Sequence, residues 1–415
     1  MSAGLVNAFR PHADELHAAD IAPSVRRLRA FLGQARIDEA RQARAIVAAQ
    51  NNPFRLMVLD EKQPWLDAFS EFDRLTRNDT QPLPLEVPRS VFLAAEAGFV
   101  LGQLLPGLPE ALQGDMRSKL LDMHGKAHPV LMEWATARFY QQQGFRIAWT
   151  DRNVAGPEFR CERAAVAFHV ECKRITRAAK ERLNDRTALT LGNAVVRAMA
   201  ERGLAGEIRL DTALTENAPS EADVAAAVRA VLPTGEHPQQ VNVDVPGIGC
   251  LCGVVRGLPA VAQTNLRART DAQLAHQEQG CRYFVASLPL GAAPPRDAVV
   301  LALSGPRLTL KEHHDHIDAV LNSAAEQLTA ALPGVVMMEI QGIVDARMFH
   351  EGPAFGQMAE RAFAAYPTTA AVVWRGERYD VPQPDGFVVN QTAFAVRNGA
   401  CTFDDARAIP LFDHG

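Results

Sequence analysis

Two charged residues near the middle of the chain, Glu171 and Lys173, are separated by one residue and are the clearest candidates for chemistry. From Phe168 onward the side chains alternate between apolar and polar. Because a strand sends alternate side chains to opposite faces, we expect His169, Glu171 and Lys173 to share one face. An imidazole, a carboxylate and an ammonium can bind ions and exchange protons. Charges are rarely placed on a buried strand without a partner, so this stretch predicts a site.

The elements around this stretch would hold it in a small sheet. Residues 128–145 place apolar side chains at three- and four-residue spacings, which predicts a helix, and Gly144 suits its C-terminal cap. Residues 145–151 follow as a strand. A turn then leads to 158–163 and 165–176, which predict an antiparallel pair. The local order is therefore helix, strand, strand, strand.

Length and charge narrow the class of protein. The chain has 415 residues, of which 47% are hydrophobic and 22% charged, and this composition indicates a globular protein with a large core. Its length suggests about two or three domains. The net charge of −5 argues against a protein coated by nucleic acid over its whole surface, but it allows a local basic groove.

The cysteines and the N-terminal residues favour a location in the cytoplasm. Six cysteines occur without CxxC spacing, so we expect reduced thiols instead of a zinc site or a disulfide scaffold. Cys250 and Cys252 lie in a Gly-rich stretch that predicts a tight turn with buried thiols. The first residues lack the apolar segment of a signal peptide, and no apolar run is expected to span a membrane.

Two regions of different character follow from the pattern. Residues 1–125 predict a mostly helical accessory domain, with helices at 24–50, 64–77 and 90–105. Strands and helices alternate afterwards, which predicts an α/β domain with a mixed sheet over 126–415. Its further strands are expected at 206–214, 241–249, 281–288, 297–305, 335–342, 370–376 and 385–394, and its further helices at 177–203, within 216–240 and at 313–332.

The central residues resemble the signature of the PD-(D/E)XK nuclease superfamily. In this chain the signature reads Pro157-Glu158, followed by Glu171-Cys172-Lys173. Glu133, on the preceding helix, matches the place of a carboxylate that is common in the superfamily. The resemblance covers residues 126–176 directly, and it implies a restriction-endonuclease-like mixed β-sheet flanked by helices. The chain departs from the signature at one point, because Glu158 stands where the pattern has Asp.

The resemblance implies a metal-dependent nuclease that hydrolyses phosphodiester bonds, with DNA as the expected substrate. Such hydrolysis uses a divalent ion, Mg²⁺ or Mn²⁺, held by oxygen ligands. Glu158 and Glu171 would bind the ion together with the backbone carbonyl of Cys172. Lys173 would hold the attacking water and offset charge on the phosphate. Glu133 would add a ligand or orient a water.

Basic residues beside the motif predict contact with nucleic acid. Arg174, Arg177 and Lys180 follow Lys173 closely, and His169 points to the same predicted face as Lys173. These side chains would contact phosphates next to the site. The alternative interpretation of the basic residues is a solvated helix face with pairs of charges along it.

The later part of the fold is open to two interpretations. In the first, the helix and strand of 313–342 complete the nuclease-like sheet, and about 177–310 is an insertion or an elaboration of the sheet. In the second, helix 177–203 and strand 206–214 are the core elements. We favour the first, because the helix before Pro333-Gly334 looks like the second helix of the superfamily.

Three other interpretations stand beside the nuclease. Glu171 and Lys173 could form an ordinary charge pair on a solvated sheet face. A nuclease-like fold could persist without cleavage, as a module that binds nucleic acid or a protein partner. The chain could also be an unrelated α/β protein.

The His-rich stretch at 311–316 suits the start of a helix better than a metal site. The expected partner is nucleic acid, with no membrane, and a homodimer is allowed.

Overall fold

The chain divides into two compact units in the structure, which is a computed structural model. Unit 1 comprises residues 1–41, 60–176 and 310–415, and unit 2 comprises residues 42–59 and 177–309. The residues that the structure describes are 18–49, 63–76, 89–122, 127–150, 156–175, 183–215, 219–263, 265–266, 281–290, 296–306, 308–341, 354–379 and 389–411.

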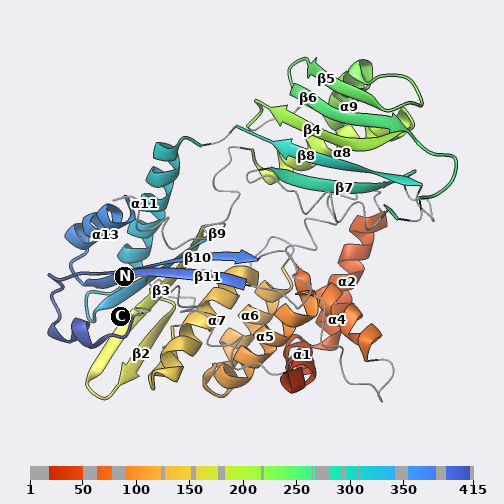
Figure 1. The fold of residues 1–415 in the computed structure, drawn as a ribbon. Coiled ribbons are helices and arrows are strands. Elements are labelled where there is room, and N and C mark those ends of the chain that lie inside the picture. Colours follow the sequence, from red (N-terminus) through yellow and green to blue (C-terminus); the bar gives the residue numbers. More distant parts are fainter. Residues whose placement is uncertain are drawn as a thin grey trace, which may run out of the picture. The chain divides into compact units, whose positions relative to one another are not determined.

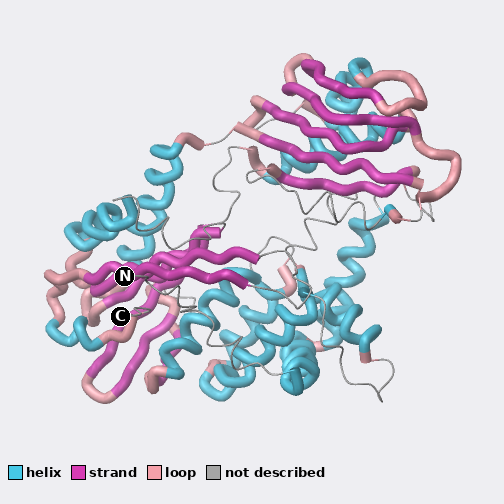
Figure 2. The backbone as a smooth tube through the Cα atoms, in the orientation of Figure 1, coloured by secondary structure: helices cyan, strands magenta, loops and turns pink. Residues whose placement is uncertain are grey.

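A group of helices comes first in the chain and shares one hydrophobic core with the first sheet (Figures 1 and 2). The sequence-based domain boundary lies at residue 125, but this core includes Met116 before that point and Trp134 after it. The indole Nε1 of Trp134 donates to Sδ of Met116 at 3.1 Å. The helices are α1 (Ala18–Leu32), α2 (Gln34–Ala49), α4 (Pro64–Leu75), α5 (Arg89–Leu104), η1 (Leu105–Gly107), α6 (Glu110–Leu120) and α7 (Ala127–Gln142).

Helices α1 and α2 replace the single helix that was predicted for 24–50. Gly33 lies between them with a φ of +83°, in the left-handed conformation that glycine adopts at helix ends. Its amide donates to the carbonyl oxygen of Arg29 at 3.0 Å, which closes α1. The apolar spacing runs on across Gly33, so the pattern alone did not reveal the break.

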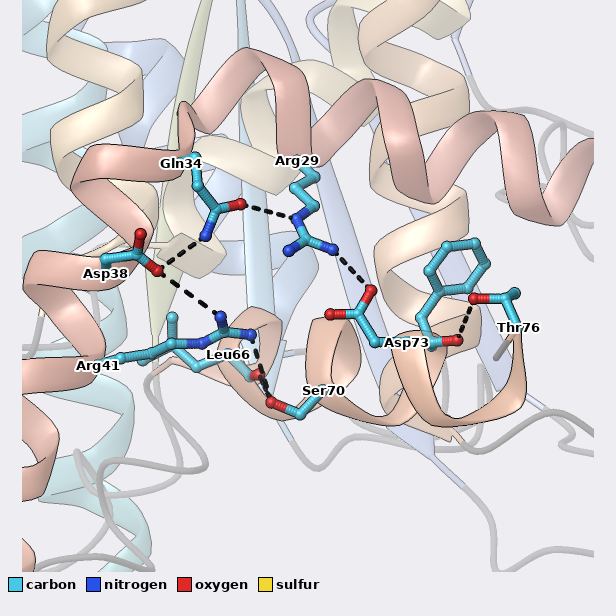
Figure 3. A network of polar contacts seen from close by, with 9 residues as sticks. Arg29, Gln34, Asp38, Arg41, Leu66, Ser70, Asp73 and Thr76 are labelled. Atoms are coloured by element: carbon cyan, nitrogen blue, oxygen red, sulfur yellow. Dashed lines mark hydrogen bonds and ion pairs between the residues drawn. The ribbon is translucent and has the colours of Figure 1, made fainter. Parts of the chain in front are cut away.

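Polar side chains join α1, α2 and α4, as Figure 3 shows. The guanidinium of Arg29 donates to Gln34 at 3.0 Å and to Asp73 at 2.7 Å. Arg41 of α2 donates to the hydroxyl of Ser70 on α4 at 3.3 Å. These groups are largely exposed, so they add orientation to a helix group whose stability comes from its apolar core.

Helix α5 is a core helix of unit 1. By length and composition alone, the 18 residues Ser90–Gly107 could cross a membrane, which the sequence analysis did not recognise. Val91 and Leu101 of this segment are fully buried in unit 1. A Cβ atom on Gly98 would lie 1.9 Å from the carbonyl oxygen of Ser24, so α1 and α5 approach each other at a distance that only glycine permits.

The first sheet has the strand order β1-β2-β3-β9-β10-β11. Strands β3, β9 and β10 are parallel, and the other neighbours are antiparallel. Unit 2 is inserted in the sequence after β3, and α11 then leads the chain back to β9. The elements are β1 (Arg146–Trp149), β2 (Phe159–Arg163), β3 (Val166–Ile175), α11 (Leu310–Gln327), β9 (Gly334–Gln341), α13 (Ala354–Ala365), β10 (Thr369–Tyr379), β11 (Val389–Arg397) and η3 (Asp404–Ala408).

The two faces of β3 meet different helices. On one face, the ring of Phe168 lies 5.0 Å from the ring of Tyr140 in α7. On the other face, Lys173 contacts Gln327 at the end of α11. Helix α13 packs on β10, next to α11, as Figure 1 shows. The alternation predicted for β3 is confirmed, and the charged residues of the motif lie on the α11 side.

Unit 2 contains a second mixed sheet, with the order β5-β6-β4-β8-β7. Strands β4 and β8 are parallel, and the other neighbouring pairs are antiparallel. The apolar side chains of the sheet form a core with two helices. The elements are α8 (Asp185–Glu201), β4 (Leu204–Thr212), α9 (Glu221–Val231), β5 (Gln239–Val245), β6 (Gly249–Gly257), β7 (Arg282–Leu288) and β8 (Asp297–Ser304).

The α/β class predicted for the chain is confirmed, with two mixed sheets in place of one. One local expectation was wrong: Cys250 and Cys252 lie on strand β6, where the sequence predicted a tight turn, and both thiols are partly exposed. The turn was predicted because this stretch is rich in glycine. A Cβ atom on Gly253 would lie 2.3 Å from the carbonyl oxygen of Glu207, so this glycine permits close pairing with β4.

Candidate active site

Glu171 is the most deeply buried member of the predicted site, with none of its surface exposed. Its Oε1 accepts from the ammonium of Lys173, and its Oε2 makes no well-formed hydrogen bond, although the backbone of Glu158 lies close enough to the carboxylate to lower its pKa. Burial raises the pKa of Glu171 to about 7; Lys173 opposes this rise, and the charge of Glu158 adds to it. A carboxyl with a pKa near neutrality and one unsatisfied oxygen is unusual inside a protein.

Glu158 lies beside Glu171 at the start of β2. Its amide donates to the carbonyl oxygen of Val170 at 3.0 Å, which places the backbone of Glu158 next to the residue that precedes Glu171. The influence of Glu158 on the pKa of Glu171 shows that the two carboxylates are electrostatically coupled. The structure therefore brings together the two acids that the motif predicted as metal ligands.

Lys173 joins the site to the end of α11. Its Nζ pairs with Glu171 and also donates to Oε1 of Gln327 at 3.2 Å. Its side chain is 27% exposed. Gln327 is the last residue of α11, where the partial negative charge of the helix end favours a cation. Gln327 was not among the residues predicted for the site.

His169 lies on the same face of β3 and is held in place by a neighbour after α11. Its Nδ1 is 2.9 Å from Oγ1 of Thr329. It pairs in register with Arg160 on β2. Burial, followed by the positive charge of Arg160, lowers the pKa of His169, so the neutral imidazole is favoured near pH 7. A neutral ring can hydrogen-bond to phosphate but adds no charge to the predicted contact.

Cys172 and Glu133 belong to the α7 side of the sheet. The Cys172 thiol hydrogen-bonds Thr136 of α7. Burial raises its pKa well above the ordinary value, and the charges of Glu158, Glu133 and Glu171 raise it further. The thiol is therefore protonated, which leaves the backbone carbonyl as the ligand that the sequence predicted. Glu133 is buried on α7, and its charge is one of those that raise the pKa of Cys172.

Of the three basic residues predicted to contact phosphate after the motif, only Arg174 lies among the described residues. Arg174 was predicted to contact phosphate, but its side chain is 6% exposed and pairs with Glu339 at 3.0 Å. Arg177 and Lys180 lie outside the described residues. Sequence reasoning missed Glu339 and its second partner, Arg375. The available signal was Glu339 as the single charge in an otherwise apolar strand, and Arg375 directly after the apolar residues 370–374.

The donor atoms at Glu158 and Glu171 fit a hard divalent cation. Carboxylate oxygens are the ligands that Mg²⁺ prefers, and Mg²⁺ commonly takes one or two of them and keeps several waters. The unsatisfied Oε2 of Glu171 is an orphaned buried oxygen of the required kind. Within the described part of the chain, no group of three or more His, Cys, Asp or Glu side chains is arranged to hold a metal ion. In the structure, Lys173 neutralises Glu171.

Comparisons with known proteins gave no relative to set beside this geometry. No protein-family model, no curated protein and no solved structure matches the chain. The chemistry of the site is therefore argued from the residues of this chain and their arrangement.

Proposed function

We propose that the protein is a metal-dependent nuclease that hydrolyses phosphodiester bonds, with DNA as its substrate. The observation that carries this proposal is the buried carboxylate of Glu171, which has one oxygen paired with Lys173 and the other without a well-formed hydrogen bond. A fully buried carboxylate of this kind, beside a second acid and a lysine, suits ion binding, since most buried polar atoms in proteins have a hydrogen-bond partner.

The order of elements in unit 1 supports the restriction-endonuclease-like interpretation. Helix α7, strands β1, β2 and β3, helix α11 and strand β9 follow one another in the order that the resemblance to the PD-(D/E)XK superfamily implies. Strand β9 pairs with β3 in parallel, and residues 177–309 between them form a separate unit. This arrangement favours the interpretation in which those residues are an insertion.

The residues of the site would divide the work between them. Mg²⁺ or Mn²⁺, when bound, would supply Lewis acidity at the phosphate and activate water. Glu158 and Glu171 would hold the ion, together with the backbone carbonyl of Cys172. Lys173 would orient the attacking water through its Nζ and offset the charge that develops on the phosphate. Gln327 would keep that ammonium at the site.

The test is cleavage of linear and circular DNA by the full chain, with Mg²⁺ or Mn²⁺ and with EDTA as the metal-free reference. We expect cleavage with either ion and its loss in Lys173→Ala. Lys311→Ala is the matched control, because Lys311 lies on α11 and its side chain is 84% exposed. Cleavage that continues unchanged in Lys173→Ala would refute the assigned site.

A second candidate function is a non-catalytic nuclease-like module that binds nucleic acid or a protein partner. It is favoured by the pairing of Glu171 with Lys173 and by the absence of a three-residue metal group among the described residues. Calorimetry separates the two functions. A protein that takes up neither Mg²⁺ nor Mn²⁺, or whose uptake is untouched by Glu171→Ala, is the binding module.

A further inference from the structure

The face of β3 that points away from Glu171 and Lys173 carries a buried row of charges. Arg174, Glu339 and Arg375 occupy paired positions on β3, β9 and β10, near the carboxyl ends of these parallel strands. Their side chains are 6%, 2% and 5% exposed. Nε of Arg174 lies 3.0 Å from Oε1 of Glu339, and Nη1 of Arg375 lies 3.3 Å from Oε2. One carboxylate thus bridges two guanidiniums across three strands.

The row by itself has an excess of positive charge, and burying an unbalanced charge is unfavourable. Helix α7 packs on this face and carries a buried acid, Glu133. Thr136 of α7 hydrogen-bonds the thiol of Cys172, and Glu133, three residues earlier, lies on the same face of the helix. Cys172 precedes Arg174 by two residues and so shares its face of β3. Glu133 is therefore buried on the side of α7 that faces this side of β3, and the formal charges of the four residues sum to zero.

We propose that four buried residues form one charge-balanced network that positions Lys173 for catalysis: Glu133, Arg174, Glu339 and Arg375. The inference rests on the proposed nuclease function. It makes Glu133 a positioning residue in place of a metal ligand, and it moves Arg174 from phosphate contact to the same network.

The network acts through the backbone of β3. Lys173 and Arg174 are neighbours, so a fixed Arg174 side chain on one face fixes the direction of Lys173 on the other. The ion pairs also hold the register of β3 against β9, and a slip by one residue would turn Lys173 towards α7. Attraction between opposite charges is strongest where water is excluded, and all of these side chains are buried.

The first experiment is a double-mutant cycle on thermal unfolding, with Glu133→Gln, Arg174→Met and the double variant. The double variant removes one charge of each sign, so we expect a smaller loss of Tm than the sum of the two single losses. A control cycle joins Glu133→Gln to Lys311→Ala, on the exposed side of α11, and should be additive. Additive losses in both cycles would overturn the network.

The second experiment measures the site itself in the full chain. In Glu339→Gln we expect kcat for cleavage of linear DNA to fall by about 10- to 100-fold, because misplacement of Lys173 weakens the reacting geometry. KM should change by less than about twofold, since uniform substrate binding is untouched. Arg375→Lys keeps the charge and should retain most of kcat, which also provides a folded variant if Glu339→Gln is unstable. Equal losses of kcat in Arg375→Lys and Arg375→Met would overturn the positioning role.

Binding of Mn²⁺, measured by calorimetry, separates positioning from metal ligation. We expect Glu133→Gln to bind Mn²⁺ within about twofold of the unmodified protein, and Glu171→Gln to bind at least about tenfold more weakly. Weakening by Glu133→Gln as large as that by Glu171→Gln would make Glu133 a metal ligand and overturn the proposal. If the unmodified protein neither cleaves DNA nor binds Mn²⁺, the nuclease function fails, while the unfolding cycle still decides whether the network exists.

Discussion

Each of the two sheets contains a fully buried carboxylate, and the two carboxylates are held in opposite ways. In unit 2, Asp297 accepts from Nε and Nη2 of Arg256 at 3.0 and 3.1 Å, and from the amide of Ala298 at 2.8 Å. In unit 1, Glu171 accepts from Lys173 through one oxygen, and its other oxygen makes no well-formed hydrogen bond. Both carboxylates are fully buried, but only Asp297 is hydrogen-bonded through both of its oxygens.

This contrast distinguishes a buried carboxylate that stabilises the fold from one that could take part in function. A carboxylate that receives a two-pronged guanidinium and a backbone amide is stabilised in its charged form and serves the fold. A buried carboxylate with one oxygen that lacks a well-formed hydrogen bond destabilises the fold. Its presence therefore favours a role in ligand binding or in a reaction. We therefore regard Asp297 as the structural reference against which Glu171 can be tested.

The largest expected effect is on cleavage. Glu171→Gln should lower the rate of DNA cleavage by roughly 10²- to 10⁴-fold, because it removes an anionic ligand while keeping the shape of the side chain. Asp297→Asn should leave kcat of the folded protein unchanged. Equal losses in both variants, measured on the folded fraction, would show that the contrast between the two carboxylates carries no functional meaning.

The next effect is a dependence of stability on pH. Unfolded glutamate titrates near 4.5, whereas the pKa of folded Glu171 is about 7. Between these values the folded protein holds a proton that the unfolded chain has lost, so the free energy of unfolding falls as pH rises. The full loss is about 3 kcal/mol above pH 7.

Urea unfolding at pH 5 and pH 8, in metal-free buffer, measures this loss. The difference in stability between the unmodified protein and Glu171→Gln should change by about 2.5 kcal/mol between the two pH values, in favour of the variant at pH 8, because part of the full loss has already occurred at pH 5. Parallel pH curves for the two proteins would mean that Glu171 titrates normally.

A smaller effect is expected at the structural reference. Asp297→Asn should destabilise unit 2 by about 2 kcal/mol, the order expected for lost hydrogen bonds to a charged group. The side chain of Arg256 is 28% exposed and can still reach water, which limits the loss. Chemical unfolding followed by a probe in unit 2 gives the value, and a change below the error would contradict the assigned role.

The smallest effect is expected where both charges are in water. Asp315→Ala breaks the ion pair with Lys311 on α11, where the two side chains are 62% and 84% exposed. Tm should stay within the error of the measurement, and high salt should remove any residual change, because water and salt screen exposed charges. A larger shift of Tm would show that α11 depends on its surface charges.

The sequence predicted the parts of the fold that repeat at short range. Alternation along β3 predicted which side chains share a face. The charge pair of Glu171 and Lys173 was only an alternative interpretation, and it assumed a solvated face, whereas Glu171 is buried. The partners Gln327, Glu339 and Arg375 come from elements far along the chain; the packing of α11 on β3 brings in Gln327, and the register between parallel strands brings in the other two. No local pattern encodes that register, so these contacts could not be predicted.

Two local errors have local causes. The left-handed conformation of Gly33 splits a helix whose apolar pattern is continuous. The glycines around Cys250 suggested a turn, although close strand pairing needs them as well. Glycine permits both structures, and tertiary contacts decide between them.

The insertion of unit 2 between β3 and α11 has a consequence for the time at which the site forms. Lys173 and Gln327 are 154 residues apart in the chain. A ribosome that adds about 5 to 20 residues per second would make Gln327 on the order of ten seconds after Lys173. Residues 177–309 of unit 2 are synthesised in that interval, before β9 is available to pair with β3. We therefore expect the newly synthesised chain to complete the core of unit 1 late and to form the candidate active site only after that.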